Sequence, residues 1–428
     1  MTSEILLMNK NCAVLAADSA ATLSSPHKVY ECNKVFSLSE ANPVGVMIYQ
    51  NPLICNTPAE TLIKEYRKRR AGEAWMPSLD DYADDFLGFL DKESSGRSGR
   101  RGLIKKDSIE RDAQHQVRVV WASLVDEMSR MANEEIDKML YSGKVEVLDT
   151  DSIFQEVAKR FKRYWERNVD PSAYGKNLRG LRRICGGRFA DTLSDGLGLT
   201  EPERHLEEVL DITALMISSD KPLDSTTGMI FAGFGRDDVF PAYRECCVDG
   251  RFFNGIKTKT VNAERITEDS RSMIRTFAQN DVSNTFLNGI DPEVFNVIFD
   301  SFEVLLNDTT MAFAENEIKE GKTSAKAIEA ANRKALKKLS SSTQSKIMRE
   351  YYDPVEGAVS FMSKAEMAQM AESLINITSL RRHVSVYGDE SVGGPVDVAV
   401  ISRGEGLIWI KRKHYFDIAL NPQFIKRT

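Results

Sequence analysis

The first eighteen residues constrain the fold of this chain most, because their pattern predicts a β-hairpin that ends in an acid. A short apolar run at residues 5–7 is followed by a polar turn around Lys10 and by a second apolar run at residues 12–17, after which comes Asp18. Two apolar runs separated by a polar turn are typical of antiparallel strands. A hairpin centred near Lys10 pairs residues whose numbers sum to about twenty, so the pattern predicts that Thr2 lies opposite Asp18.

Thr2, Asp18 and Lys34 follow one another at equal intervals, and their chemistry suggests a catalytic set. If the initiator Met1 is removed, Thr2 carries its hydroxyl next to a free α-amine. A threonine hydroxyl is a weak nucleophile that needs a base, and an α-amine with an ordinary pKa of about 8 can supply it. A nearby lysine ammonium disfavours a second positive charge and so lowers the pKa of the amine, while Asp18 would keep Lys34 charged and oriented.

The segments AVLAADSAATLS and HKVYECNKVFSL resemble the start of a proteasome β-type subunit or of its bacterial proteasome-like relatives, which are N-terminal-nucleophile (Ntn) hydrolases. In that family a mature N-terminal threonine, an aspartate sixteen residues on and a lysine sixteen beyond it form the catalytic set, and Thr2, Asp18 and Lys34 match these positions without a gap. At the end of the next strand the family usually has a glycine whose backbone N–H completes the oxyanion hole. Gln50 stands in that region here.

The end of the chain carries a second part of the resemblance. The segment GDESVGGPVDVAVISRGEGLIWIKRK resembles the closing segment of the family, which often contains the pattern Asp-x-x-Ser-Gly-Gly. Asp389, Gly393 and Gly394 match that pattern, whereas Val392 occupies the serine position and Ser391 stands one residue before it. In the family this Asp and this Ser assist the N-terminal amine. The supporting residues predicted for the site are Ser19, Gln50, Asp389 and Ser391.

Composition excludes several classes of protein. A chain of 428 residues with 42% hydrophobic content can bury a large core, and its net charge of −6 gives no overall basic field that would attract nucleic acid. The sequence contains no run of eighteen apolar residues, the length that could span a membrane, and no signal region precedes the first strand. A cytoplasmic location is therefore expected. The six cysteines and five histidines lack the spacing of a disulfide framework or a metal site, so neither a metal nor another cofactor is predicted.

The order of the expected elements is strands, two helices, strands, two helices, strands, which suits two sheets between helical layers. The resemblance implies an α+β fold of this kind, the four-layer α-β-β-α Ntn-hydrolase sandwich. Residues 1–71, 204–306 and 350–428 are predicted to form this core. Residues 72–203 are predicted to be an inserted helical domain, and residues 307–349 a second helical insertion.

Four helices are expected in the core. Capping boxes at residues 57–60 (TPAE) and 363–366 (SKAE) predict the starts of the first and the fourth. The pattern at residues 205–218 predicts the second helix, and the third is expected to begin at Asp291.

The leading hypothesis is an N-terminal threonine peptidase, in which Thr2 attacks a peptide bond and forms an acyl-enzyme. The resemblance implies a peptide or protein substrate and a homo-oligomer, with a ring as one possibility and any ATPase or regulator on a separate chain. Gly321-Lys322-Thr323 does not make a phosphate loop, because Asn316 stands where that motif requires glycine.

Two alternatives stay open. The chain could be a catalytically inactive scaffold with the same fold, whose helical insertion binds a partner, and the missing oxyanion glycine favours this hypothesis. It could also keep Thr2 as the nucleophile and act on a small amide instead of a peptide.

Overall fold

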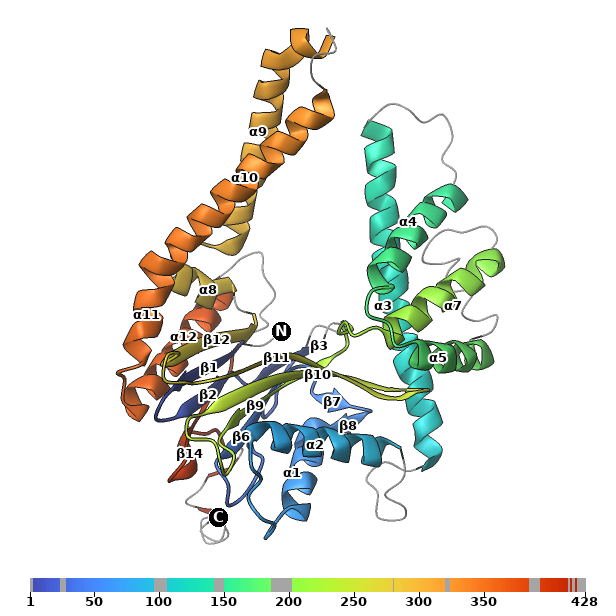
Figure 1. Cartoon of the computed structure of the whole chain (residues 1–428). Coiled ribbons are helices and arrows are strands. Elements are labelled where there is room, and N and C mark those ends of the chain that lie inside the picture. Colours follow the sequence, from blue (N-terminus) through green and yellow to red (C-terminus); the bar gives the residue numbers. More distant parts are fainter. Residues whose placement is uncertain are drawn as a thin grey trace.

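Two five-stranded antiparallel sheets form the body of the protein, and two groups of helices project from it (Figure 1). This computed structural model describes residues 3–23, 28–95, 106–141, 150–185, 202–279, 281–319, 324–384, 393–414, 416–417 and 420–421. The first sheet has the order β12-β1-β2-β13-β14, and the second has the order β11-β10-β9-β6-β5.

The strands of the first sheet are β1 (Ser3–Asn9), β2 (Ala13–Ala17), β12 (Ser272–Ala278), β13 (Asp397–Ser402) and β14 (Gly406–Lys411). Those of the second sheet are β5 (Val35–Ser37), β6 (Val44–Gln50), β9 (Thr227–Gly233), β10 (Ala242–Phe252) and β11 (Gly255–Arg265). Two short antiparallel pairs lie outside the sheets: β3 (Ala20–Leu23) with β4 (Lys28–Glu31), and β7 (Leu53–Ile54) with β8 (Thr57–Pro58).

The predicted N-terminal hairpin forms, and its turn is held by Asn9. The backbone N–H of Asn9 donates to the carbonyl of Cys12 at 3.1 Å, which closes a turn of two residues, Lys10 and Asn11. The side-chain oxygen of Asn9 also accepts from the N–H groups of Asn11 at 2.9 Å and Cys12 at 3.2 Å. Asparagine commonly binds its own backbone two residues on, so this residue fixes where the chain reverses.

The register of the hairpin differs by one residue from the prediction. Because the turn lies between Lys10 and Asn11 and is not centred on Lys10, Glu4 pairs with Ala17. Ser3 then faces Asp18, whose backbone N–H donates to the Ser3 carbonyl at 3.2 Å. Asp18 was predicted to face Thr2, which lies outside the described residues, and it faces the next residue, Ser3, instead.

The hydrophobic core is divided into clusters that separate the sheets and the helices. One cluster lies between the two sheets and includes Leu6, Leu15, Met47 and Ile230. A second covers the other face of the first sheet, where it meets α8 (Asp281–Asn288), α11 (Asp353–Val359) and α12 (Lys364–Val384). A third covers the other face of the second sheet, where it meets α1 (Ala59–Arg69) and α2 (Leu79–Ser94). The described part of the chain is thus a mixed fold of antiparallel sheets and flanking helices.

One of the two predicted capping boxes forms. At the start of α12 the N–H of Ser363 donates to the Glu366 carboxylate at 2.7 Å, and the N–H of Glu366 donates to the Ser363 hydroxyl at 3.3 Å. At the start of α1 the cap residue is Pro58, with no side-chain hydrogen bond. Thr57 and Pro58 belong to β8, and Glu60 binds Asn33 and Lys64 instead, so the box at residues 57–60 was predicted wrongly.

The second helix on the core is α2. Tyr82 and Phe86 of α2 are fully buried in the cluster that also contains Met229 and Phe231 of β9. The helix predicted for this role at residues 205–218 exists as α7 (Pro202–Ser218), but its buried side chains pack among other helices. The predicted role of that segment is therefore wrong. The division of the chain into a core and two insertions stays a prediction, and we propose that the first insertion begins after α2.

In the part of the chain that the structure describes, a group of four helices packs around its own apolar cluster beside the second sheet (Figure 1). Its members are α3 (Lys106–Tyr141), α4 (Thr150–Trp165), α5 (Pro171–Ile184) and α7. Trp121, Phe154 and Leu210 are among its buried residues. We call this unit the helical group.

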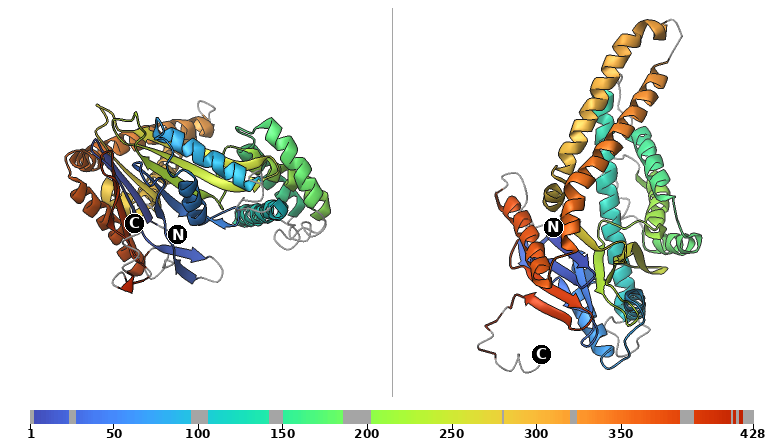
Figure 2. Two further views of the ribbon diagram at one scale, coloured as in Figure 1. Left: turned by 90° about the horizontal axis from the view of Figure 1, so that it is seen from below. Right: turned by 60° about the vertical axis from the view of Figure 1, so that its left-hand side comes forward.

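Two further helices form an arm that extends away from the sheets (Figures 1 and 2). The arm consists of α9 (Pro292–Lys319) and α10 (Ala325–Ile347), and the π-helical segment η2 (Met348–Tyr352) joins α10 to α11. None of the residues of α9 is buried, so α9 is not the third core helix that was predicted to begin at Asp291. The shorter α8 packs on α12 in its place, with Val282 and Leu287 buried.

Within the described ranges, no helix combines the length and the apolar character that a membrane-spanning segment needs.

Candidate functional site

Asp18 lies just after β2 and is 1% exposed. One carboxylate oxygen, Oδ1, accepts from the backbone N–H of Ser3 at 3.0 Å and from Lys34 Nζ at 2.5 Å. The other, Oδ2, accepts from the N–H groups of Gly393 at 2.9 Å and Ala20 at 3.3 Å. Four donors, one from the same loop and three from other parts of the chain, therefore fix the orientation of this one side chain.

Lys34 stands directly before β5 and is 2% exposed, so its ammonium is removed from solvent. Its two carboxylate neighbours are Asp18, at 2.5 Å, and Glu4 of β1, at 3.5 Å from Nζ to Oε1. Glu4 is fully buried. A buried ammonium needs compensating negative charge, and here two acids on neighbouring strands provide it.

The closing segment of the chain meets this cluster at Gly393. Besides donating to Asp18, Gly393 accepts hydrogen bonds at its carbonyl from the N–H groups of Ser19 at 3.3 Å and Ala20 at 3.1 Å. The next residue, Gly394, has a φ of 76°, which favours glycine. Gly393 and Gly394, the two glycines singled out in the sequence, thus lie beside the segment that carries Asp18.

A second lysine, Lys413, is partly buried near the first, with 12% of its side chain exposed. Its Nζ donates to Ser19 Oγ at 2.6 Å, to the Cys32 carbonyl at 2.8 Å and to Asp397 Oδ2 at 2.9 Å. Ser19 Oγ in turn donates to the carbonyl of Pro395. This network joins the residue after Asp18 to the segment that leads into Lys34.

Sequence reasoning did not identify Glu4 or Lys413. Glu4 could have been identified from the sequence, because it is the one charged residue in the otherwise uncharged segment of β1. Lys413 could not, since it stands in a run of three basic residues that looks like an ordinary solvated chain end. Its partner Ser19 is 394 residues away.

Gln50 ends β6 with a φ of 64°, a left-handed conformation that favours glycine. The backbone N–H of Ile48 donates to the Lys34 carbonyl at 2.9 Å, and residues two apart on a strand direct their N–H groups the same way. The N–H of Gln50 therefore points to the side of Lys34. The unusual φ does not change this, because it rotates the chain after that N–H.

Lys34 also lines a small pocket. It is lined by Ala21, Cys32, Lys34, Ile48, Tyr49, Gln50, Asn51 and Pro52. Burial raises the pKa of the Cys32 thiol above its ordinary value, and the cations Lys34 and Lys413 offset part of this rise. Lys34 and Gln50, which were selected from the sequence for different roles, thus face the same pocket.

The structure brings together Asp18, Lys34 and Ser19, and it places Gln50 on the pocket next to Lys34. Thr2, Asp389 and Ser391 lie outside the described residues. Ser3, to which Thr2 is bonded, lies at the centre of the cluster.

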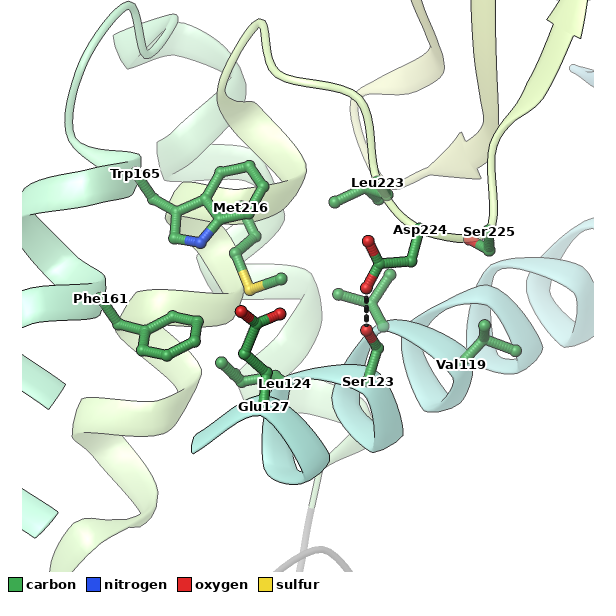
Figure 3. A pocket seen from close by; sticks show the side chains of 11 residues that line it. Val119, Ser123, Leu124, Glu127, Phe161, Trp165, Met216, Leu223, Asp224 and Ser225 are labelled. Atoms are coloured by element: carbon green, nitrogen blue, oxygen red, sulfur yellow. Dashed lines mark hydrogen bonds between the residues drawn. The ribbon is translucent and has the colours of Figure 1, made fainter. Parts of the chain in front are cut away.

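A second pocket, of about 230 Å³, lies in the helical group (Figure 3). Its walls are mainly apolar and include Phe161 and Trp165 of α4. Glu127 and Asp224 lie at its side, and Ser123 Oγ donates to Asp224 Oδ2 at 2.5 Å (Figure 3). This pocket shares no lining residue with the one beside Lys34.

No protein-family model matches the chain, and a search of curated proteins finds no match. Among solved structures, the Anbu complex from Pseudomonas aeruginosa, described as a helical assembly, is 9% identical at a TM-score of 0.32, covering 99% of this chain and 93% of that chain. Anbu from Yersinia bercovieri, described as an ancestral beta-subunit, is 8% identical at a TM-score of 0.30, with 99% and 93% covered. Anbu from Hyphomicrobium sp. strain MC1, in a Gly-1 mutant, is 10% identical at a TM-score of 0.29, with 100% and 94% covered.

These matches correct the family assignment. The similar solved structures named above are Anbu complexes, not the proteasome β-type subunits that the sequence motifs suggested. Three matching positions define a chemistry, but they do not separate one family that uses it from another. At identities of 8–10% and TM-scores of 0.29–0.32 the likeness supports no inference about activity, so function has to be argued from the site itself.

Proposed function

We propose that this chain is an N-terminal threonine hydrolase that cleaves peptide or other amide bonds, with Thr2 as the nucleophile after removal of Met1. The observation that carries this proposal is the shared oxygen of Asp18, which binds the Ser3 backbone N–H at 3.0 Å and Lys34 Nζ at 2.5 Å. The Ser3 nitrogen is the atom to which Thr2 is bonded. This shared oxygen supports the proposal that a free Thr2 terminus would lie near the Lys34 ammonium.

The first half of the reaction forms an ester on Thr2. The Thr2 hydroxyl oxygen attacks the amide carbonyl carbon while the α-amine of Thr2 accepts the hydroxyl proton. As the carbon–nitrogen bond breaks, the amine passes this proton to the leaving nitrogen. Lys34 favours the uncharged amine by disfavouring a second positive charge, and Asp18 holds Lys34 in place.

In the second half, water hydrolyses the ester. The Thr2 amine accepts a proton from water as the water oxygen attacks, and it returns a proton to the Thr2 oxygen as the ester bond breaks. The acid product leaves and the terminus is restored.

The backbone N–H of Gln50 is our candidate for the oxyanion donor. It points to the side of Lys34 and lies on the small pocket there, which supports this role. Preorganised N–H donors stabilise the charge that develops on the carbonyl oxygen. The role needs only a backbone donor, which glutamine supplies, and the left-handed φ of Gln50 affects the chain after that donor.

We propose a four-layer α-β-β-α arrangement for the core that holds this site. Its support is the order of the apolar clusters, one between the sheets and one on the other face of each sheet. We also propose that the protein works as a homo-oligomer, with a ring as one form and any unfolding ATPase on another chain; the similar Anbu complex is likewise described as a helical assembly.

Hydrolysis of fluorogenic peptides and of small amides tests the proposal. We expect Thr2→Ala to abolish turnover of the preferred substrate, and Thr2→Ser to retain part of it because the hydroxyl and the amine remain. Lys34→Met should lower kcat/KM by at least about 100-fold, the usual range for a group that supports general base catalysis. A matched control is Lys10→Met, which removes a lysine from the far end of the same hairpin.

Turnover that survives Thr2→Ala would contradict the proposal for both substrate classes. Activity on small amides but not on peptides would keep Thr2 as the nucleophile and change the substrate. Absence of turnover together with a fully retained Met1 would favour the scaffold hypothesis.

A further inference from the structure

The arm presents apolar side chains that nothing in the described chain covers. None of the residues of α9 is buried, and Phe313, Val297 and Leu305 are 86%, 62% and 61% exposed. The exposed large hydrophobic residues of α9 are Val294, Val297, Ile298, Phe302, Val304, Leu305 and Phe313. Several of them follow one another at intervals of three and four residues, so they form a stripe along one side of the helix. An exposed apolar stripe of this size marks an interaction surface.

The two helices of the arm differ in charge. The α9 segment contains six acidic residues and one lysine, Lys319, which gives it a net charge of −5. The α10 segment contains six basic residues and one acid, Glu329, which gives it a net charge of +5. Within the arm, Arg333 and Glu303 pair at 3.7 Å. Other charged residues on both helices, among them Asp300, Asp308, Lys334 and Lys337, are exposed.

The contact between α9 and α10 is already specified by its own polar core. Asn332 of α10 is buried, and its side-chain nitrogen donates to Asn307 Oδ1 at 2.8 Å and to Thr310 Oγ1 at 2.7 Å. A buried asparagine of this kind fixes the register of two packed helices. The faces of α9 and α10 that point toward each other are therefore already packed together. The apolar stripe of α9 remains available to a partner.

We propose that the arm binds the arm of a second copy of this chain, antiparallel, so that α9 of each copy packs on α10 of the other. In a dimer with two-fold symmetry both α9–α10 contacts between the copies form together, and in each of them an acidic helix meets a basic one. The product is a four-helix bundle that buries the apolar stripe of both copies. The arm extends away from the sheets, so this arrangement places the two bodies at opposite ends of the bundle (Figures 1 and 2).

The arm is large enough for a stable dimer. A helix of the length of α9, 28 residues, is about 42 Å long and about 10 Å wide. Two helix–helix contacts of that size bury on the order of 1,600 Å² in total, the usual area of a specific protein interface. The stripe and the opposite charges thus account for both affinity and orientation.

Sedimentation velocity on the full-length chain tests the proposal. We expect the double variant F302D/L305D to halve the mass of the wild-type assembly at equal concentration, because it places charge in the stripe. A matched control is Val239→Asp, a change at a 65% exposed apolar residue in the segment between β9 and β10, which should leave the mass unchanged. Circular dichroism shows whether the helices of each variant remain folded.

Charge reversal tests the pairing of α9 with α10. One variant, K334E/K337E, lowers the net charge of α10 from +5 to +1, and a second, D300K/D308K, changes that of α9 from −5 to −1. Each alone should associate more weakly than the wild-type chain, whereas an equimolar mixture of the two should associate more strongly than either, because the unchanged acidic α9 of one variant then meets the unchanged basic α10 of the other.

Three results would overturn the proposal. One is a wild-type chain that stays monomeric at about 100 µM, since interfaces of this area usually have dissociation constants that are micromolar or lower. The second is an F302D/L305D variant with the mass of the wild-type assembly. The third is a mixture of charge variants that associates no better than its components, which would rule out the pairing of α9 with α10. None of these measurements depends on hydrolytic activity.

Discussion

Asp18 illustrates how one side chain can organise a site. Its carboxylate links β1, the segment before β5 and the closing segment through Ser3, Lys34 and Gly393. Each of these partners comes from a different part of the chain, so the carboxylate is both a structural and an electrostatic centre. Its loss would leave the Lys34 ammonium buried with Glu4 as its remaining carboxylate neighbour among the described contacts.

We therefore predict that Asp18→Asn lowers the free energy of unfolding by about 3–5 kcal/mol, the usual cost of breaking a buried ion pair by removing one partner. Urea denaturation measures this change. The control is Asp237→Asn, which breaks a fully solvated pair with Arg236 and should have almost no effect. Equal stability of the two variants would show that Asp18 is not the centre of a buried network.

Gln50 carries backbone strain that a glycine would relieve. Its φ of 64° costs an ordinary residue about 1–2 kcal/mol, part of which the higher entropy of an unfolded glycine offsets. We predict that Gln50→Gly raises the free energy of unfolding by up to about 1 kcal/mol and keeps activity, since the backbone N–H remains. Gln50→Val, with a β-branched side chain, should instead be destabilising. The reverse order of the two variants in urea denaturation would contradict this assignment.

Cys32 reports on the electrostatics of the pocket beside Lys34. Burial raises the pKa of its thiol, and Lys34 and Lys413 counter part of this effect. The reactive thiolate therefore forms only at higher pH than in a free cysteine. We predict that the rate of alkylation by iodoacetamide has its midpoint at higher pH than that of a model peptide, and that Lys413→Met moves it higher still. A midpoint below that of the peptide would show that the cations, not burial, dominate.

Local elements show where sequence reasoning succeeds. The hairpin and the capping box of α12 were predicted from adjacent residues, and both form because their hydrogen bonds are local. The hairpin register was missed by one residue, since the side chain of Asn9 selects a two-residue turn that apolar pattern alone does not reveal. The box at residues 57–60 failed because Thr57 and Pro58 pair as β8 with β7, a contact that competes with the cap.

The two cap sites form a matched pair for mutation. We predict that Ser363→Ala lowers the free energy of unfolding by about 1 kcal/mol, because it removes the acceptor for the Glu366 N–H. Thr57→Ala, at the sequence-predicted cap that does not form, should cost less than about 0.5 kcal/mol. Urea denaturation of both variants checks this, and a larger cost for Thr57→Ala would mean that α1 is capped after all.

At the scale of the whole molecule, the sequence predicts the two sheets better than the helices that project from them. The positions of β1, β2, β6, β9 and β13 coincide with apolar runs, which are strong because these strands are largely buried. The roles of α7 and α9 were assigned wrongly, since amphipathic spacing predicts a helix but not the surface on which it packs. Lys413 was missed for the same reason, because long-range contacts leave no local pattern.

The proposed site combines residues that could be selected from the sequence with residues that only the folded structure brings together. Asp18 and Lys34 could be selected from their spacing and residue type, and the structure places them 2.5 Å apart. Glu4, Gly393 and Lys413 complete their surroundings from remote parts of the chain. The role of Thr2 stays a prediction, and the account of function depends on it.

Mass spectrometry of the N-terminal peptide, after incubation of the purified protein with a panel of peptide epoxyketones, tests that role most directly. These electrophiles form a ring with the hydroxyl and the α-amine of the same residue, so they report on a nucleophilic terminus specifically. We predict a peptide that begins at Thr2 and carries one adduct, and loss of the adduct in Lys34→Met. A terminus that begins at Met1 in every molecule would contradict the account, since the amine of Thr2 would then be held in a peptide bond.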